Sequence, residues 1–224
     1  MKRIIWTFWT DINPMSDNRK RCLDSIIKNT NVEVSLITAY NLKDYEKLEC
    51  PIHPSYEYLS AVHRSDYLRT YWMHHFGGGY TDIKDTNSDW NVFFDKLEVS
   101  KCLGIGYTEI GPGGVANVGE PMKSLLKSNW KYILGNGAYI WKPGTKFTSS
   151  WLASLHYVLD LKYEMLKKFP ANNPRDHKKD GENVRDGYPI KWTELLGNLF
   201  HPLCYEYKNL ILHGLVPPSF TNYQ

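Results

Sequence analysis

The chain has 224 residues, of which 42% are hydrophobic and 23% charged, values that suit a single folded domain over residues 1–224. Its formal net charge is only +3 and it has no long run of Lys or Arg, which argues against nucleic-acid binding by charge. No segment approaches the roughly 18 consecutive apolar residues of a transmembrane helix, so we expect no membrane span.

The N-terminal segment predicts a strand, a helix and a second strand. Arg3–Thr10 is an apolar, β-branched and aromatic run, long enough for a buried strand. A turn-like segment over residues 11–17 precedes a helix at Asn18–Lys28, and Val32–Thr38 reads as the next strand. This β–α–β order favours a parallel sheet and an α/β fold.

A long helix, a glycine break and a short strand are predicted next. Apolar residues recur at helical spacing over Ser55–Phe76. The three glycines at 77–79 end this helix, because glycine adopts a left-handed C-terminal cap without strain. A very short strand at Tyr80–Ile83 then carries Asp82 and Asp85 to its end.

The remaining residues predict shorter elements around one long helix. We expect a turn or short helix at Trp90–Phe94, strands at Leu103–Gly106 and Ala138–Trp141, and helices at Lys146–Phe169 and Lys191–Leu199. Glycine-rich residues 109–120 and the tail Gly214–Gln224 should be irregular. The polar segment Pro170–Tyr188 is too long for a simple connector. It is either a mobile lid, whose basic residues reach a bound ligand, or a solvated surface insertion.

The four cysteines include no C-x-x-C pair, which argues against a zinc ribbon. Free thiols in a reducing compartment are the favoured interpretation. The N-terminus MKRIIWTFWTD has only a short apolar run and predicts a first strand rather than a signal peptide. We therefore expect a cytoplasmic protein.

Asp82 is the first candidate for chemistry. In open α/β sheets, ligands bind beyond the carboxyl ends of the strands. A carboxylate there suits Mg²⁺ or Mn²⁺, which prefer oxygen ligands and leave room for water and substrate phosphates. A carboxylate that caps local backbone amides is an equally supported interpretation of this stretch alone.

Asp66 and Arg69 are three residues apart and so share one helix face, near its buried side. They form either a simple intrahelical ion pair or a site in which Asp66 accepts from sugar hydroxyls while the planar fork of Arg69 binds phosphate. Taken alone, the spacing favours the ion pair.

His63, His74 and His75 lack the spacing of a zinc site, and we expect them to be structural. The string DIKDT departs at Lys84 from the nucleophile motif of haloacid-dehalogenase-type phosphatases.

Together these segments resemble the DXD-containing GT-A glycosyltransferases. That group includes capsular-polysaccharide-synthesis proteins, Och1-like mannosyltransferases and the large clostridial glucosylating toxins. The opening RIIWTFWT is similar to the group's first strand, with Trp9 at the position near the nucleotide base. Residues 65–69 match S-D-x-x-R, whose Asp and Arg contact the donor sugar, and residues 77–82 match G-G-x-Y-x-D. Weaker echoes lie at Asn136 and Tyr188–Gly197. The compact size also fits a virus-encoded glycosyltransferase domain of this type.

The resemblance implies a single GT-A-like α/β domain with a mostly parallel central sheet flanked by helices. It implies a hexosyltransferase of polysaccharide biosynthesis, whose residues 1–90 bind a UDP-linked sugar donor and whose residues 91–224 bind a glycan acceptor. The implied cofactor is Mn²⁺ or Mg²⁺. The implied site residues are Asp82, Asp66 and Arg69 for catalysis, Trp9, Asp66, Arg69, Tyr80 and Asp82 for the donor, and Asp82 and Asp85 for the metal.

One departure from the family pattern concerns the metal. The second Asp of D-x-D would stand at position 84, where this chain has Lys84. Asp82 alone could hold the metal with the diphosphate, Asp85 could join it after a bend, or Lys84 could partly replace the cation. If the enzyme inverts, Glu109, Glu120 and Asp186 are candidate bases, although the relatives are mostly retaining. A non-catalytic nucleotide-sugar-binding module and a metal-dependent phosphohydrolase remain alternative functions.

Overall fold

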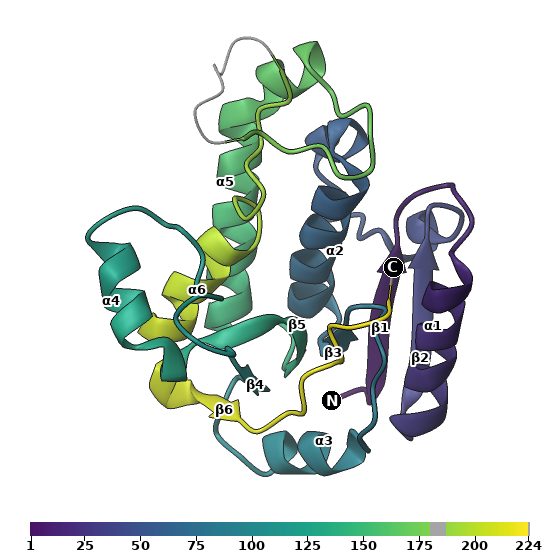
Figure 1. The fold of residues 1–224 in the computed structure, drawn as a ribbon, viewed down its shortest axis with the longest axis vertical. Helices are drawn as coiled ribbons and strands as arrows, with labels where there is room; N and C mark the ends of the chain where they lie inside the picture. Colours follow the sequence, from purple (N-terminus) through teal and green to yellow (C-terminus); the bar gives the residue numbers. More distant parts are fainter. Residues whose placement is uncertain (180–186, 224) are drawn as a thin grey trace.

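A six-stranded sheet forms the centre of the computed structural model, which describes residues 1–179 and 187–223 (Figure 1). The strand order is β2-β1-β3-β5-β4-β6. The strands are β1 (Ile4–Trp9), β2 (Glu33–Thr38), β3 (Gly78–Thr81), β4 (Gly104–Thr108), β5 (Leu134–Trp141) and β6 (Ile211–His213). β5 is antiparallel to its neighbours β3 and β4, whereas the pairs β1–β2, β1–β3 and β4–β6 are parallel. The expected α/β fold with a mostly parallel sheet is confirmed.

Six α-helices flank this sheet in the described part of the chain. They are α1 (Asp17–Asn29), α2 (Ala61–His75), α3 (Asn91–Glu98), α4 (Met122–Ser128), α5 (Lys146–Lys168) and α6 (Gly197–Glu206). Short 3₁₀ turns occur at η1 (Leu42–Tyr45), η2 (Pro54–Tyr58), η3 (Trp130–Tyr132) and η4 (Lys208–Leu210).

Two hydrophobic clusters pack on opposite faces of the sheet. Successive side chains of β1 alternate between them: Ile4, Trp6 and Phe8 join the larger cluster, and Ile5 joins the smaller one. The larger cluster also holds buried residues of α2, α5 and α6, and the smaller one those of α1 and α3. The helices therefore cover both faces, and α2 and α5 lie side by side on one of them (Figure 1).

Two predicted helices have different limits in the structure. The helix expected from Ser55 is split, and α2 starts only at Ala61, because Ser60 takes an extended conformation and its side chain caps the N–H of His63. The helix expected at Lys191–Leu199 is wrong in its position. Lys191 forms an isolated β-bridge with Lys178, and residues 192–196 form turns, in which the Thr193 carbonyl accepts from the backbone N–H of Asn198 over 3.0 Å; α6 follows from Gly197.

The glycine break ends α2 as expected but also starts the next strand earlier than predicted. Gly77 has a φ of +62°, the left-handed conformation that terminates the helix. β3 then runs from Gly78 to Thr81 instead of Tyr80 to Ile83. Asp82 is consequently the first residue after the strand, and its N–H donates to the carbonyl of Gly137, within β5, over 2.8 Å.

The polar segment after α5 is tied to the start of α2. The N–H of Val62 donates to the carbonyl of Pro174 over 3.1 Å, and the N–H of Ala171 donates to the carbonyl of Tyr58 over 3.0 Å. Residues 180–186 of the predicted lid, including Arg185 and Asp186, lie outside the described residues. The four cysteines are free thiols, as expected. In the described part of the chain, no helix combines the length and apolar character needed to span a membrane.

Candidate functional site

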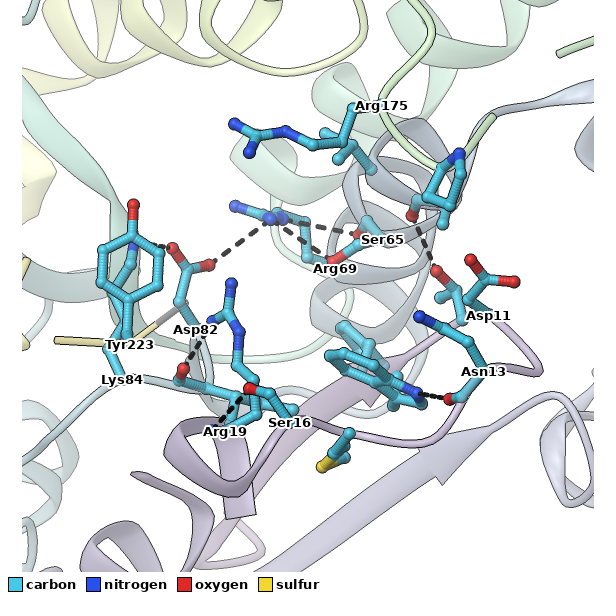
Figure 2. A pocket seen from close by; sticks show the side chains of 18 of the residues that line it. Asp11, Asn13, Ser16, Arg19, Ser65, Arg69, Asp82, Lys84, Arg175 and Tyr223 are labelled. Carbon is cyan, nitrogen blue, oxygen red and sulfur yellow. Dashed lines mark hydrogen bonds and ion pairs between the residues drawn. The ribbon is translucent and has the colours of Figure 1, made fainter. Parts of the chain in front are cut away.

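A cavity of about 690 Å³ opens at the carboxyl ends of β1 and β3 (Figure 2). From β1 the chain crosses to β2 on one side, and β3 pairs with β1 on the other. This reversal of direction leaves a crevice at the strand ends, the usual ligand position in open α/β sheets. The lining residues are Phe8, Trp9, Thr10, Asp11, Asn13, Pro14, Met15, Ser16, Arg19, Ala61, Val62, Ser65, Arg69, Tyr80, Asp82, Ile83, Lys84, Pro174, Arg175, Trp192 and Tyr223.

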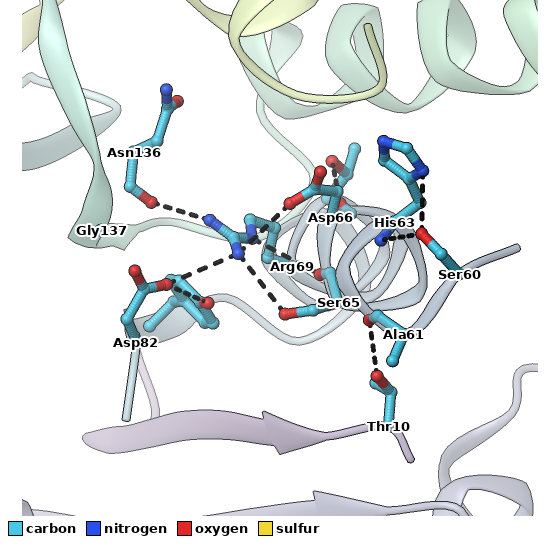
Figure 3. A network of polar contacts seen from close by, with 12 residues as sticks. Thr10, Ser60, Ala61, His63, Ser65, Asp66, Arg69, Asp82, Asn136 and Gly137 are labelled. Atoms are coloured by element: carbon cyan, nitrogen blue, oxygen red, sulfur yellow. Dashed lines mark hydrogen bonds and ion pairs between the residues drawn. The ribbon is translucent and has the colours of Figure 1, made fainter. Parts of the chain in front are cut away.

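Arg69 is the central side chain of this site (Figure 3). Its Nη2 lies 3.3 Å from Oδ1 of Asp66 and 3.5 Å from Oδ1 of Asp82, while its Nη1 donates to the carbonyl of Asn136 over 2.9 Å. The guanidinium carbon lies 4.5 Å from the centroid of the Tyr80 ring. Burial lowers the pKa of Arg69, but Tyr80 and the two carboxylates raise it by more, so the guanidinium stays charged. Arg69 therefore joins α2 to β3 and β5.

Asp66 lies behind Arg69 rather than in the cavity wall. Its side chain is only 4% exposed and is absent from the lining, whereas its partner Arg69 lines the cavity. Burial raises the pKa of Asp66 to about 7, against the opposing charge of Arg69. A carboxyl group with that pKa can act either as an acceptor or as a donor near neutral pH.

Asp82 points into the cavity with its side chain 22% exposed. Its Oδ1 accepts from the hydroxyl of Tyr80 and its Oδ2 from the ammonium of Lys84, each over 2.6 Å. Burial alone would raise the pKa of Asp82, but Lys84 and Arg69 lower it by more, so the pKa falls below its ordinary value. Asp82 is thus a carboxylate held by three donors.

The loop after β1 forms the opposite wall. Trp9 lines the cavity, and its indole N–H donates to the carbonyl of Asn13 over 2.7 Å, which fixes the ring against the loop. Ser16 caps α1 by accepting from the N–H of Arg19 over 3.2 Å. The N-terminus of α1 therefore faces the cavity, and such a terminus favours anionic groups (Figure 2).

The structure does not bring Asp85 into this site. Both oxygens of Asp85 accept from Nη1 of Arg21, over 2.8 and 2.6 Å, and Asp85 is absent from the cavity lining. Within residues 1–179 and 187–223, no group of three or more His, Cys, Asp or Glu side chains could hold a metal ion. Since Asp82 is the sole predicted metal ligand in the cavity and its oxygens already have donors, the side chains present do not fit the expected two-carboxylate metal site.

The other predicted residues lie elsewhere. Glu109 accepts from the N–H of Ile110 and Glu120 from the N–H of Ser124, and neither lines the cavity.

His63 is fully buried, accepts at Nδ1 from the hydroxyl of Tyr188 and donates from Nε2 to a backbone carbonyl. Burial lowers its pKa to about 4. This neutral, fully engaged histidine is structural, as expected.

Several lining residues had no distinct signal in the sequence. Tyr223 comes from the C-terminal segment, far from the family-like motifs, and Trp192 stands in Tyr188–Gly197, which carried only a weak resemblance to the family; both reach the cavity. Arg19 carries a weak signal, because it stands three residues after a Ser that can cap a helix. Arg175 was expected to reach a bound diphosphate, and it lines the cavity; Lys178 and Lys179 do not.

Comparison with known families supports the motif-based resemblance. Residues 1–83 match the family model described as capsular polysaccharide synthesis protein. The match includes Trp9, Asp66, Arg69 and Asp82 and ends just before Lys84. The resemblance to this family is therefore confirmed for the N-terminal region.

The comparisons with whole proteins are more distant. No curated protein matches the chain significantly. Among solved structures, the chain is similar to the WbbM bifunctional glycosyltransferase in its apo form, with 12% sequence identity and a TM-score of 0.41. That similarity covers 97% of this chain and 46% of the other, so this chain spans less than half the length of that structure.

Proposed function

We propose that this chain is a glycosyltransferase that moves a hexose from a nucleoside-diphosphate sugar, with UDP as the nucleotide, to a glycan acceptor. The observation that carries the proposal is the cavity at the ends of β1 and β3, in which Arg69 lies between Asp66 and Asp82. Its volume of about 690 Å³ suits a ligand of this size. The family match over residues 1–83 supports a role in polysaccharide synthesis.

The charges of the cavity suit a diphosphate. Its lining includes four cationic side chains, Arg19, Arg69, Lys84 and Arg175, against the two carboxylates Asp11 and Asp82. Arginine binds phosphate oxygens with two parallel hydrogen bonds. We propose that the diphosphate lies between the start of α1 and Lys84, and that the base lies against Trp9.

The donor sugar would lie near Asp82 and Arg69. In the transfer, the bond between the anomeric carbon and the β-phosphate oxygen breaks, and its electron pair stays on the phosphate. The acceptor hydroxyl oxygen forms the new bond to that carbon, and the hydroxyl proton is released to water. The chain's cations stabilise the charge that develops on the leaving diphosphate. Asp82 and Arg69 orient the sugar so that its anomeric carbon faces the acceptor.

Residues 91–224 are proposed to supply the acceptor side. Trp192 is 41% exposed and lines the same cavity as the donor residues. Its indole ring lies 5.0 Å from the ring of His177 and 5.8 Å from the guanidinium carbon of Arg175. An exposed indole face of this kind offers an apolar platform for a sugar ring.

Product analysis tests the proposal. The protein is incubated with a panel of UDP-sugars and simple saccharide acceptors, with and without MnCl₂, and the products are separated by chromatography. A transferase releases UDP together with a glycosylated acceptor or free sugar, and Asp82→Asn should abolish that release. Release of sugar phosphate or inorganic phosphate would indicate a phosphohydrolase. Binding without any turnover would indicate a nucleotide-sugar-binding module, and either result would overturn the proposal.

A further inference from the structure

Lys84 stands where the second metal-binding carboxylate of the family pattern is expected, and it is bonded to the first. Its Nζ donates to Oδ2 of Asp82 over 2.6 Å, and its side chain is only 10% exposed. The backbone explains the pairing, because the N–H of Lys84 donates to the carbonyl of Asp82 over 2.7 Å. This tight three-residue turn brings the two side chains together beside the cavity.

The carboxylate of Asp85 pairs with Arg21 instead of lying beside Asp82. Its carboxylate binds Arg21 of α1, and Nη2 of the same arginine donates to the carbonyl of Asn222 over 2.7 Å. The carbonyl of Asp85 accepts from the N–H of Ser219 over 2.8 Å. Asp85 therefore holds the C-terminal segment against α1, and turning it toward Asp82 would break this arrangement.

The segment held in this way packs against Lys84. The ammonium of Lys84 lies 4.5 Å from the ring centroid of Phe220 and 4.9 Å from that of Tyr223. The guanidinium of Arg19 lies 4.7 Å from the Tyr223 ring and donates to the carbonyl of Ile83 over 2.7 Å. Tyr223 thus contacts two cations that both line the cavity, and Figure 2 shows it beside Lys84.

From this geometry we infer that Lys84 and Arg19 together supply the positive charge that a divalent metal ion supplies in D-x-D transferases. The protein then binds the diphosphate of its donor without a divalent cation. This inference rests on the proposed function and leaves its substrate class unchanged. It replaces the metal ion that the family resemblance implies.

The charge at the site is sufficient for this role. The cavity lining carries the four cations Arg19, Arg69, Lys84 and Arg175 and the two carboxylates Asp11 and Asp82. This leaves a surplus of two positive charges, comparable to the charge of one divalent ion. These cations are fixed by packing and hydrogen bonds, so little reorganisation is needed when the phosphate binds. Because Lys84 is largely shielded from water, its attraction for a phosphate is stronger than that of an exposed lysine.

Calorimetric titration of UDP into the intact protein is the test. We expect the wild type to bind UDP with the same affinity in EDTA and in excess MnCl₂. Lys84→Met keeps the packing against Phe220 and Tyr223 but removes the charge. It should weaken UDP binding in EDTA by roughly 10- to 100-fold, as expected for the loss of one charge-assisted hydrogen bond. Lys28→Met, on the exposed end of α1, is the matched control and should bind like the wild type.

For Lys84→Asp we expect the opposite of the wild-type behaviour, namely UDP binding that depends on the metal. It restores the D-x-D pattern, so UDP binding should be lost in EDTA and regained with MnCl₂. Thermal melting in the absence of ligand checks that each variant is folded. The comparison of wild type in EDTA and MnCl₂ needs no variant, so it decides the question even if a variant misfolds.

The outcomes separate this inference from the proposed function. Wild-type binding that disappears in EDTA and returns with MnCl₂ overturns the role of Lys84 and leaves the nucleotide-sugar site intact. Unchanged EDTA binding by Lys84→Met overturns it as well. If neither UDP nor any other nucleoside diphosphate binds under either condition, the proposed function itself fails.

Discussion

Nη1 of Arg69 donates to the backbone carbonyl of Asn136 over 2.9 Å, across 67 positions of sequence. The next residue, Gly137, accepts from the N–H of Asp82 over 2.8 Å. β5 therefore positions both an arginine and a carboxylate that belong to the N-terminal motifs. The family match ends at residue 83, but β5, which lies outside that match, positions Arg69 and Asp82 within it.

Arg69→Lys should lower both the stability of the fold and the affinity for the UDP-sugar, although it keeps the positive charge. A single ammonium cannot reproduce the planar fork that contacts Asp66, Asp82 and Asn136 together. We expect a loss of about 1–3 kcal/mol in the free energy of unfolding and of about tenfold or more in UDP-sugar affinity. Arg64→Lys on the same helix is the control, because the guanidinium of Arg64 donates to carbonyls of the 3₁₀ turn η2 and does not line the cavity. Urea unfolding and calorimetry measure both effects, and equal behaviour of the two variants would contradict the central role of Arg69.

The pKa of about 7 for Asp66 makes a pH-dependent prediction. Its folded-state value is raised above the ordinary value near 4, so the stabilising contribution of its protonated form is present at low pH. That contribution is lost as the pH rises through about 7. The free protein should therefore lose stability between about pH 4 and pH 7, and Asp66→Asn should flatten this slope. Denaturant unfolding across the pH range is the measurement.

Donor binding should show the opposite trend, because an ionised Asp66 holds the guanidinium of Arg69, which lines the cavity, more strongly than a neutral carboxyl does. Affinity for the UDP-sugar, relative to UDP alone, should rise as the pH passes through about 7. An Asp66→Asn variant that keeps the wild-type pH dependence in both experiments would show that the titration of Asp66 does not cause it.

The local features of this site could be predicted from sequence because they depend on neighbouring residues. The spacing of Asp66 and Arg69 places them on one helix face, and glycine at position 77 takes the left-handed conformation that ends α2. A strand leads to Asp82, although the pattern placed Asp82 inside Tyr80–Ile83 and the structure places it directly after β3. The first strand and the helix after it were also predicted to within one residue at each end.

The partners of these residues could not be predicted, because they depend on tertiary contacts. A tight turn with no clear sequence signal lets Lys84 donate to the carboxylate of Asp82. Asp85 accepts from Arg21 and so does not reach the cavity. Tyr223 reaches the cavity from the far end of the chain. The position of α6 was also missed: the helix was expected from Lys191, but Lys191 pairs with Lys178 in an isolated bridge and residues 192–196 form turns.

Arg175 is predicted to bind the diphosphate from the segment that follows α5. It lines the cavity, and the adjacent Pro174 is fixed to α2 through Val62. Arg175→Ala should lower UDP affinity by roughly tenfold, the effect of one charge-assisted hydrogen bond. Lys178→Ala is the control from the same segment, since Lys178 does not line the cavity. Calorimetry compares the two, and an equal loss in both variants would indicate a general effect of charge rather than a contact.

The same segment should become protected when ligand binds. If Arg175 holds the phosphate, the described residues 170–179 are held against α2 more firmly in the complex. Limited proteolysis should then cut near these residues more slowly with saturating UDP than without it. Equal cutting rates, with binding verified by calorimetry, would leave this segment as plain surface.

Gly79 is predicted to be required for the position of β3. A Cβ atom at this position would lie 2.7 Å from Cζ3 of Trp90, which is fully buried and cannot move freely. Gly79→Ala should therefore destabilise the protein by about 1–3 kcal/mol, the usual cost of overpacking a core. Because the displaced strand carries Asp82 at its end, UDP affinity should fall as well. Gly111→Ala is the matched control: a Cβ there meets nothing within 4 Å, so its effect should stay within about 0.5 kcal/mol. Urea unfolding measures the stability of both variants, and a Gly79→Ala protein as stable as Gly111→Ala would show that β3 and Trp90 can separate without cost.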